Sequence, residues 1–340
     1  MKKNNRCFII AEIGVNHNNN ISTAKKMISL AKKAGADAVK FQTFKACRLA
    51  RLTTPKVKYQ KRSGSKNETH YQMLKKLELS EKNHIVLKRF CKIKKIEFIS
   101  TPYDLESLKF LLSIGVKTIK ISSADLTDHL MHNYLAKKKI RTIISTGMST
   151  LDEIEETVKL YKKYKNKKVS ILHCVSNYPS SDKSLNLKNI ITLRNKFRYP
   201  IGFSDHSSGN IASIIALSYG AQIVEKHFTL DHKMKGPDHL ASSTPDEFAD
   251  LVKCIRRSEI MKGSYFKKIQ NEEKSIRQIS RKSLIYKKDL DTNHFLKESD
   301  LTAIRPGNGL IGNKLKFILN KKLKKKVYKN NLVNLNDFKK

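Results

Sequence analysis

The sequence predicts a (β/α)8 TIM barrel followed by a small β-rich domain. Short apolar, β-prone runs alternate with amphipathic helical patterns eight times between residues 8 and 261. Polar residues recur where these runs end, which is where a parallel barrel carries its functional groups. After Met261 the alternation stops, and the 340 residues are enough for one large barrel and a small second domain.

The alternation defines each element in order. The predicted strands are Phe8–Glu12, Ala38–Gln42, Glu97–Ser100, Thr118–Ile121, Arg141–Ser145, Val169–His173, Pro200–Phe203 and Gln222–Lys226. The predicted helices are Ser22–Ala34, Glu81–Lys94, Leu105–Ser113, His129–Lys138, Leu151–Tyr164, Leu187–Phe197, Ser208–Ser218 and Pro245–Met261. Several of these helices follow Ser or Thr and carry acidic residues in their first turn, as is typical of a capped N-terminus.

Three segments fall outside the alternation. The stretch 48–71 is long, basic and weakly periodic, which indicates a functional insertion, a lid or a disordered loop. Residues 262–280 are polar and predict a linker, and residues 281–340 predict the second domain after a barrel of residues 1–261. Gly307–Gly312 matches G-x-G-x-x-G, but it opens no βαβ unit, so a dinucleotide site is not expected.

Composition narrows the functional classes. The net charge is +39, but the lysines are spread over nearly every predicted helix, so we expect no nucleic-acid partner, and we interpret the run 321–326 as a solvated face. No apolar run approaches the roughly 18 residues of a membrane span, and no signal-peptide pattern is present. Five widely spaced cysteines predict free thiols in a reducing compartment, the cytoplasm.

Two lysines lie inside otherwise apolar predicted strands. Burying Lys40 and Lys120 without a partner would be costly, so each needs an anion. One interpretation is a structural ion pair with a carboxylate such as Glu12 or Asp125. The other is a phosphate or carboxylate ligand held by both lysines and by strand-end hydroxyl groups, which are those of Thr101, Ser123, Ser145 and Ser204.

Histidines also follow neighbouring strands. His206 and His227 come at matching positions at the ends of the last two predicted strands, so their side chains could converge on one metal ion. The signal is the spacing alone, because no HxxxH, CxxC or HExxH motif accompanies it. His17 is expected to orient a loop, and His173 to form a hydrogen bond within the barrel mouth.

The ordered motifs together resemble the N-acetylneuraminate (sialic acid) synthase family. They are IAEIGVNH (10–17), VKFQT (39–43), ISTP (99–102), KISSAD (120–125), STGM (145–148), HCVSNYP (173–179), GFSDH (202–206), EKHFT (225–229) and GPD (236–238). The stretch IRPGNG (304–309) resembles the C-terminal antifreeze-like (SAF) domain of the same family.

The resemblance implies an enzyme that condenses phosphoenolpyruvate with an open-chain N-acetylhexosamine, using a divalent metal, Mn²⁺ or Mg²⁺. It implies His206 and His227 as the metal ligands. The implied phosphoenolpyruvate site is Lys40, Thr101, Lys120, Ser123, Ser145, Ser176 and Ser204, and the implied sugar and proton-transfer residues are Glu12, Gln42, Asp125, Tyr178 and Asp238. Arg305 resembles the residue that reaches into the partner's barrel to hold the N-acetyl group, which implies a domain-swapped homodimer.

The acceptor sugar stays open at this point. Asp125 stands where some members of the family have Glu, and Ser176 where some have Asn, so sugar choice is affected more than the reaction. N-acetylmannosamine, giving N-acetylneuraminate, is the first expectation, and a diacetamido-trideoxy hexose, giving a legionaminic-type acid, is the alternative. A polyanion-binding module with a degenerate barrel is a more distant alternative, against which the intact Lys40, Lys120, His206 and His227 argue.

Overall fold

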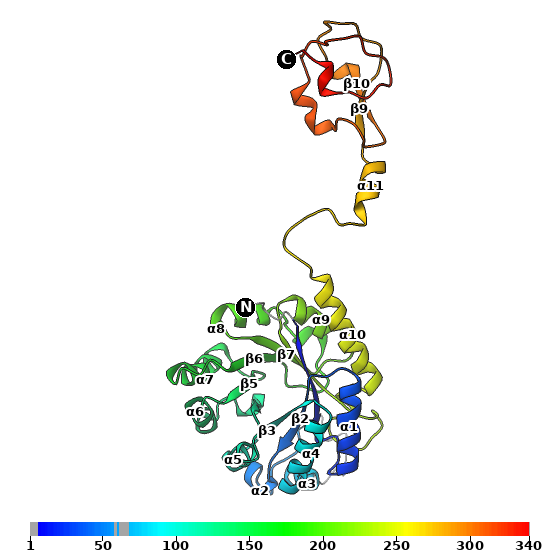
Figure 1. Ribbon diagram of the computed structural model, residues 1–340. Helices are drawn as coiled ribbons and strands as arrows, with labels where there is room; N and C mark the ends of the chain where they lie inside the picture. The colour runs from blue at the N-terminus through cyan, green and yellow to red at the C-terminus, as the bar shows by residue number, and fades with distance from the viewer. Residues whose placement is uncertain (1–5, 58–59, 61–67, 340) are drawn as a thin grey trace. The chain divides into compact units, whose positions relative to one another are not determined.

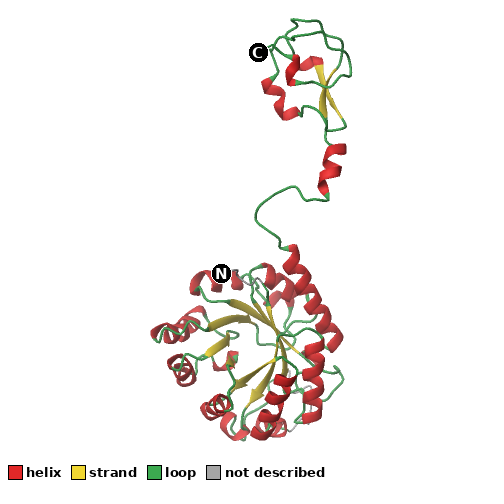
Figure 2. Ribbon diagram, viewed as in Figure 1, coloured by secondary structure: helices red, strands yellow, loops and turns green. Residues whose placement is uncertain are grey.

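Eight parallel strands close into a barrel, in chain order and with helices on the outside (Figure 1; Figure 2). The computed structural model describes residues 6–57, 60 and 68–339. The strands are β1 (Phe8–Gly14), β2 (Ala38–Thr43), β3 (Glu97–Pro102), β4 (Thr118–Ile121), β5 (Arg141–Ser145), β6 (Val169–Cys174), β7 (Ile201–Asp205) and β8 (Ile223–His227). The predicted barrel is therefore confirmed, with several strands running one or two residues further towards their carboxyl ends.

The outer helices are α1 (Ile21–Lys33), α4 (Glu81–Ile93), α5 (Leu105–Ser113), α6 (His129–Lys137), α7 (Leu151–Lys163), α8 (Asn189–Phe197), α9 (Ile211–Ser218) and α10 (Pro245–Met261). Thr150 and Thr244 form capping boxes with Glu153 and Glu247, which satisfy backbone groups at the starts of α7 and α10. Helices α8 and α9 begin two and three residues later than predicted. Among the described helices, none is both long and apolar enough to cross a membrane.

The barrel interior has an apolar floor. Alternate residues of the strands meet there in one buried cluster, which consists of Ile10, Ala38, Ile99, Ile143, Leu172 and Ile223. Residues on the opposite faces of the strands, such as Val39 and Phe41, join the larger core under the helices. Because strand side chains alternate with a period of two, the residues two positions beyond the floor also face inward. These are Glu12, Lys40, Thr101, Ser145, Cys174 and Glu225, so a polar layer lies directly above the apolar one.

An insertion between β2 and α4 forms its own small structure. It contains α2 (Ala46–Leu49) and α3 (His70–Leu77), and the latter begins with a capping box made by Thr69 and Gln72. Met73, Leu74 and Leu77 pack with Val15 and Phe44 in a separate apolar cluster. The expected insertion or lid at 48–71 is thus helical at both ends, while residues 58–59 and 61–67 lie outside the described residues.

The second compact unit is formed by residues 264–340. It has its own core around Tyr286, Leu296 and Leu323. Its regular strands are β9 (Ser283–Tyr286) and β10 (Leu301–Ile304), which pair antiparallel, and short bridges and 3-10 turns make up much of the rest. The segment predicted to be a linker, residues 262–280, contains the exposed helix α11 (Glu273–Ser280).

Gly202 tests the floor of the barrel. A Cβ atom at this position would lie 2.5 Å from both the Ile223 carbonyl oxygen and Leu172 Cδ2, so Gly202→Ala should cost about 1–3 kcal/mol of unfolding free energy by overpacking. Urea unfolding followed by circular dichroism measures this cost. Gly312→Ala is the control, because a Cβ atom there meets nothing within 4 Å. An unchanged midpoint for Gly202→Ala would contradict the tight packing of this layer.

Candidate active site

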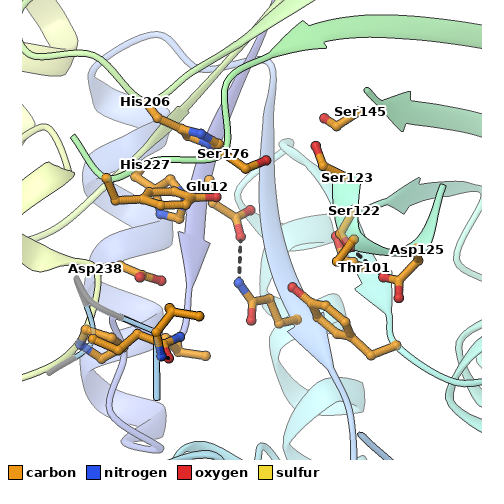
Figure 3. A pocket seen from close by; sticks show the side chains of 18 of the residues that line it. Glu12, Thr101, Ser122, Ser123, Asp125, Ser145, Ser176, His206, His227 and Asp238 are labelled. Carbon is orange, nitrogen blue, oxygen red and sulfur yellow. Dashed lines mark hydrogen bonds between the residues drawn. The ribbon is translucent and has the colours of Figure 1, made fainter. Parts of the chain in front are cut away.

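A cavity of about 680 Å³ opens at the carboxyl ends of the barrel strands. This volume is in the usual range for a small-molecule site. Every site residue predicted in the barrel lines it, namely Glu12, Lys40, Gln42, Thr101, Lys120, Ser123, Asp125, Ser145, Ser176, Tyr178, Ser204, His206, His227 and Asp238. The close view shows His206, His227 and Asp238 across the cavity from Ser123, Ser145 and Asp125 (Figure 3).

Four charged side chains form the base of the cavity. Lys40 and Lys120 are only 5% and 2% exposed. Lys40 Nζ lies 2.5 Å from Glu12 Oε2 and 4.0 Å from Glu225 Oε1, and Lys120 Nζ lies 3.8 Å from the same Glu225 oxygen. Glu225 therefore stands between the two ammonium groups, and Glu12 completes the pairing of Lys40.

Burial and pairing shift the pKa values of this network in opposite directions. Burial lowers the pKa of Lys120, and the nearby Lys40 adds to the effect. Burial also opposes the charge of Lys40, but Glu12 and Glu225 hold its pKa above the usual value. Burial opposes the charge of Glu225 too, but Lys120 and Lys40 lower its pKa overall. Burial and the negative charge of Glu225 raise the pKa of Glu12 despite Lys40.

Glu225 was missed as a site residue from the sequence. The expected partners of the lysines were Glu12 or Asp125, and only Glu12 is found paired among the described residues. The Asp125 carboxylate instead accepts a hydrogen bond from Ser122 Oγ at 2.5 Å. The available signal was the same as for the lysines, an ionisable residue inside the apolar run of β8.

Hydroxyl groups extend the polar layer around the lysines. Lys120 donates to Ser145 Oγ at 2.6 Å and to the Ile121 carbonyl at 3.0 Å, while Lys40 donates to Thr101 Oγ1 at 3.3 Å. Ser204 Oγ donates to Glu225 at 2.9 Å. The Gly147 N–H donates a hydrogen bond to Ser123 Oγ. A Cβ atom at position 147 would lie only 2.9 Å from the same hydroxyl, so the absence of a side chain lets the backbone come this close to Ser123. The arrangement offers several donors to a small anion.

The two histidines meet on the other side of the cavity. Their ring centroids are 5.5 Å apart, and Tyr178 packs against both rings. His206 Nδ1 bonds the Val175 carbonyl at 2.9 Å and lies 3.7 Å from Cys174 Sγ, which leaves Nε2 for a ligand. Burial and the charges of His206 and the lysines lower the pKa of His227 far below its usual value, so it is neutral.

These histidines fit a divalent metal. His227 Nδ1 is buried without a hydrogen-bond partner, as expected for a ring nitrogen that lacks its ligand. Within the described residues no group of three His, Cys, Asp or Glu side chains forms a metal cluster. The chain would then supply two imidazoles and leave the other coordination positions to water or substrate.

Two further carboxyls line the upper cavity. Burial raises the pKa of Asp125 to about 6. Burial also raises the pKa of Asp238 to about 6, with a contribution from the negative charge of Glu12. Gln42 Nε2 donates to Glu12 Oε1 at 3.3 Å and fixes that carboxylate (Figure 3). Groups that titrate near neutrality are suited to transfer protons.

Three predicted residues lie elsewhere. Arg305 belongs to the second unit and comes just beyond β10. His17 Nδ1 accepts the Asn19 N–H at 2.9 Å, in agreement with a role in shaping the loop. His173 Nε2 bonds the Leu185 carbonyl at 2.6 Å, in agreement with the expected hydrogen bond.

The fold and the position of the cavity define a (β/α)8 barrel with an enzyme-type site at its carboxyl-terminal face. The chain belongs to the NeuB family, whose model matches residues 27–267. It is 43% identical to N,N'-diacetyllegionaminic acid synthase of Legionella pneumophila, over 93% of this chain and 90% of that protein. It is 33% identical to human N-acetylneuraminate-9-phosphate synthase, over 87% of this chain and 82% of that protein.

A solved structure agrees with this assignment. The N-acetylneuraminic acid synthetase of Leptospira borgpetersenii, crystallised with citrate, superposes with a TM-score of 0.70 at 35% identity and covers 80% of this chain and 90% of that one. The chain is thus a sialic-acid-type synthase, and the relatives differ in the sugar acid that they make.

Glu225→Gln tests the ionic network. Removing this charge leaves two buried ammonium groups with only Glu12, so we expect the unfolding free energy of the barrel to fall by about 3 kcal/mol at pH 7.5. Glu106→Gln is the control, because Glu106 pairs with Lys109 on the surface and should change stability by less than about 0.5 kcal/mol. Equal effects of the two variants in urea unfolding would show that Glu225 is not a compensating charge.

Asp125→Asn tests the raised pKa of this carboxyl. A carboxyl with a folded pKa near 6 and an unfolded value of 3.8 stabilises the protein below pH 3.8, and this contribution is lost as the pH rises through 6. The wild type should therefore lose this contribution between pH 4.5 and pH 7.5, whereas the variant has none to lose. Over that range the unfolding free energy of the variant should rise relative to that of the wild type by on the order of 1–2 kcal/mol, allowing for solvent screening. Asp250→Asn, in the exposed part of α10, is the control and should show no such gain.

Proposed function

We propose that this protein condenses phosphoenolpyruvate with the open-chain form of an N-acetylated amino hexose, giving a nine-carbon 2-keto-3-deoxy sugar acid and phosphate. The observation that carries the proposal is the meeting of two buried lysines and two buried histidines in one cavity of a NeuB-family barrel. A degenerate barrel would have no reason to retain two costly buried ammonium groups beside converging imidazoles.

The lysine side of the cavity suits phosphoenolpyruvate. This substrate carries a phosphate and a carboxylate on three carbons, and the site offers two ammonium groups together with the hydroxyls of Thr101, Ser123 and Ser145. Ser176 and Ser204 extend the same ring of hydroxyl groups. Charge-assisted hydrogen bonds to phosphate and carboxylate oxygens are stronger than neutral ones.

The histidine side suits the sugar aldehyde. His206 and His227 would hold Mn²⁺ or Mg²⁺, which when bound supplies a Lewis acid for the aldehyde oxygen. Tyr178, packed on both imidazoles, holds the rings in place. The aldehyde carbon is then presented to C3 of phosphoenolpyruvate from across the cavity.

Three carboxyls can move the protons that the reaction needs. After carbon–carbon bond formation a water adds at C2 and loses a proton, the new alkoxide gains one, and phosphate leaves by cleavage of the C–O bond. Glu12, Asp125 and Asp238 line the cavity, and the pKa values of the two aspartates are raised to about 6.

The acceptor that we favour is a 2,4-diacetamido-2,4,6-trideoxy hexose, giving a legionaminic-type acid. The higher identity to the legionaminic acid synthase, 43% against 33% for the N-acetylneuraminate-9-phosphate synthase, supports it over N-acetylmannosamine. The capture of the N-acetyl group by Arg305 of a second copy, in a domain-swapped homodimer, stays a prediction from the family resemblance, as does the SAF character of the second unit. The free state of all five cysteines supports a reaction in the cytoplasm.

Phosphate release tests the reaction and its metal. The full-length protein with phosphoenolpyruvate, Mn²⁺ and the diacetamido sugar should release one phosphate per sugar acid formed. His206→Ala should lower kcat/KM by at least about 100-fold and weaken Mn²⁺ binding measured by calorimetry, because one of two imidazole ligands is lost. His232→Ala, a surface histidine beside Glu247, is the control and should leave both quantities unchanged.

The alternative of a polyanion-binding module makes the opposite prediction. It requires tight heparin binding and no phosphate release with any acceptor. That result, with Mn²⁺ binding unaffected by His206→Ala, would contradict the proposed function.

A further inference from the structure

A separate buried ion pair lies behind the two histidines. Asp205 is the last residue of β7 and Lys226 the last but one of β8, and the two are partners in the strand register. Lys226 Nζ lies 2.9 Å from Asp205 Oδ2, and the two side chains are 2% and 0% exposed. The residues on either side of each one line the cavity, namely Ser204, His206, Glu225 and His227. Because strand side chains alternate, Asp205 and Lys226 face the helices instead.

The Asp205 carboxylate accepts several hydrogen bonds besides this pairing. Its Oδ1 accepts the Ser207 N–H at 2.8 Å and Ser207 Oγ at 2.6 Å, and its Oδ2 accepts Ser213 Oγ at 2.6 Å. Ser213 is a buried residue of α9, so the carboxylate is also tied to a helix that covers the barrel. With directional partners on both oxygens, the carboxylate is confined to a narrow range of positions.

The pair also holds the backbone on both sides of His206. Lys226 Nζ donates to the Ser207 carbonyl at 2.8 Å. The residue before His206 and the residue after it are therefore bonded to the same ammonium group. That group belongs to the residue directly before His227. One cross-strand connection thus joins the backbone positions from which the two imidazoles project.

Fold stability alone gives little reason for an ion pair at this place. The cost of taking two charges out of water offsets most of the attraction between them, and well-packed apolar side chains in their place are often equally stable. Apolar contacts do not fix a direction, whereas a hydrogen-bonded ion pair does. Residues that orient metal ligands from behind typically change the metal affinity about 10- to 100-fold when they are replaced.

We propose that the Asp205–Lys226 pair positions the two metal-binding imidazoles. It holds the His206 and His227 rings, whose centroids are 5.5 Å apart, in the arrangement that two ligands of one ion require. The inference rests on the proposed function for the identity of that ion. Asp205 and Lys226 act through the histidines, so they are positioning residues and not catalytic ones.

Metal affinity, measured apart from activity, tests this role. The double variant Asp205→Asn/Lys226→Met removes both charges at once, so neither is left buried without a partner. Calorimetric titration of the folded, full-length variant with Mn²⁺ should show an affinity about 10- to 100-fold below that of the wild type. Phosphoenolpyruvate, titrated in the absence of metal, should bind as it does to the wild type, because Lys40 and Lys120 are unchanged.

A matched double variant removes an ion pair at the other end of the barrel. Arg256 of α10 pairs at 2.9 Å with Asp37, which comes just before β2 at the amino-terminal ends of the strands. Asp37→Asn/Arg256→Met likewise replaces an acid by its amide and a base by methionine. Whatever its effect on the urea midpoint, this variant should leave the affinities for Mn²⁺ and for phosphoenolpyruvate unchanged.

A milder variant decides if the first double variant does not fold by circular dichroism. Ser207→Ala removes one hydrogen bond to Asp205 and keeps both charges. It should weaken Mn²⁺ binding at least about 3-fold and leave phosphoenolpyruvate binding unchanged.

The outcomes distinguish this role from the proposed function. An unchanged Mn²⁺ affinity in the variant that decides, or equal losses of affinity for Mn²⁺ and phosphoenolpyruvate, would overturn the positioning role and leave the reaction intact. Mn²⁺ binding that is unaffected by His206→Ala would overturn the metal site, and the inference with it. Mn²⁺ binding that depends on both His206 and the ion pair, without phosphate release, would contradict the reaction alone.

Discussion

Two ammonium groups buried in the mouth of the barrel constrain the rest of the site. Lys40 and Lys120 cannot remain charged there without anions, and Glu12 and Glu225 supply them. The two interpretations of these lysines, a structural pair and an anion site, therefore describe the same residues in two states. In the proposed reaction, an incoming phosphate or carboxylate would compete for ammonium groups that the protein already holds in position, so little reorganisation would be needed when it binds.

The position of this network follows from the alternation of side chains along the strands. Ile10 and Glu12, or Ala38 and Lys40, differ by two residues and face the same interior, one in the apolar floor and one in the polar layer. The apolar floor stabilises the fold, and the same two-residue alternation places the ionisable side chains in the layer above it. Shifting a strand by one residue would turn both layers towards the helices at once.

Much of the site was predictable because it depends on local pattern. The strand periodicity placed Lys40, Lys120, His206 and His227 at one end of one barrel, and the structure brings them into one cavity. The ion-pair partner of Lys120 was not predictable, because Glu225 reaches it only once the barrel has closed and β8 has paired with β1. Closure is a long-range property that no local window of sequence contains.

The insertion and the second unit were harder to predict for other reasons. Helix α3 is only eight residues long, and its apolar residues face a separate small cluster, so its periodicity was too short to stand out. Helix α11 is exposed along its length, and without a buried face its sequence reads as a polar linker.

The apolar floor also has a kinetic consequence. It closes the described barrel at the amino-terminal ends of the strands, so molecules reach the lysines through the mouth that the insertion borders. A ligand bound at the base then lies behind any ligand bound against the insertion. In a pocket with a single opening, a molecule bound at the base would have to enter before any molecule bound nearer the mouth and would leave after it.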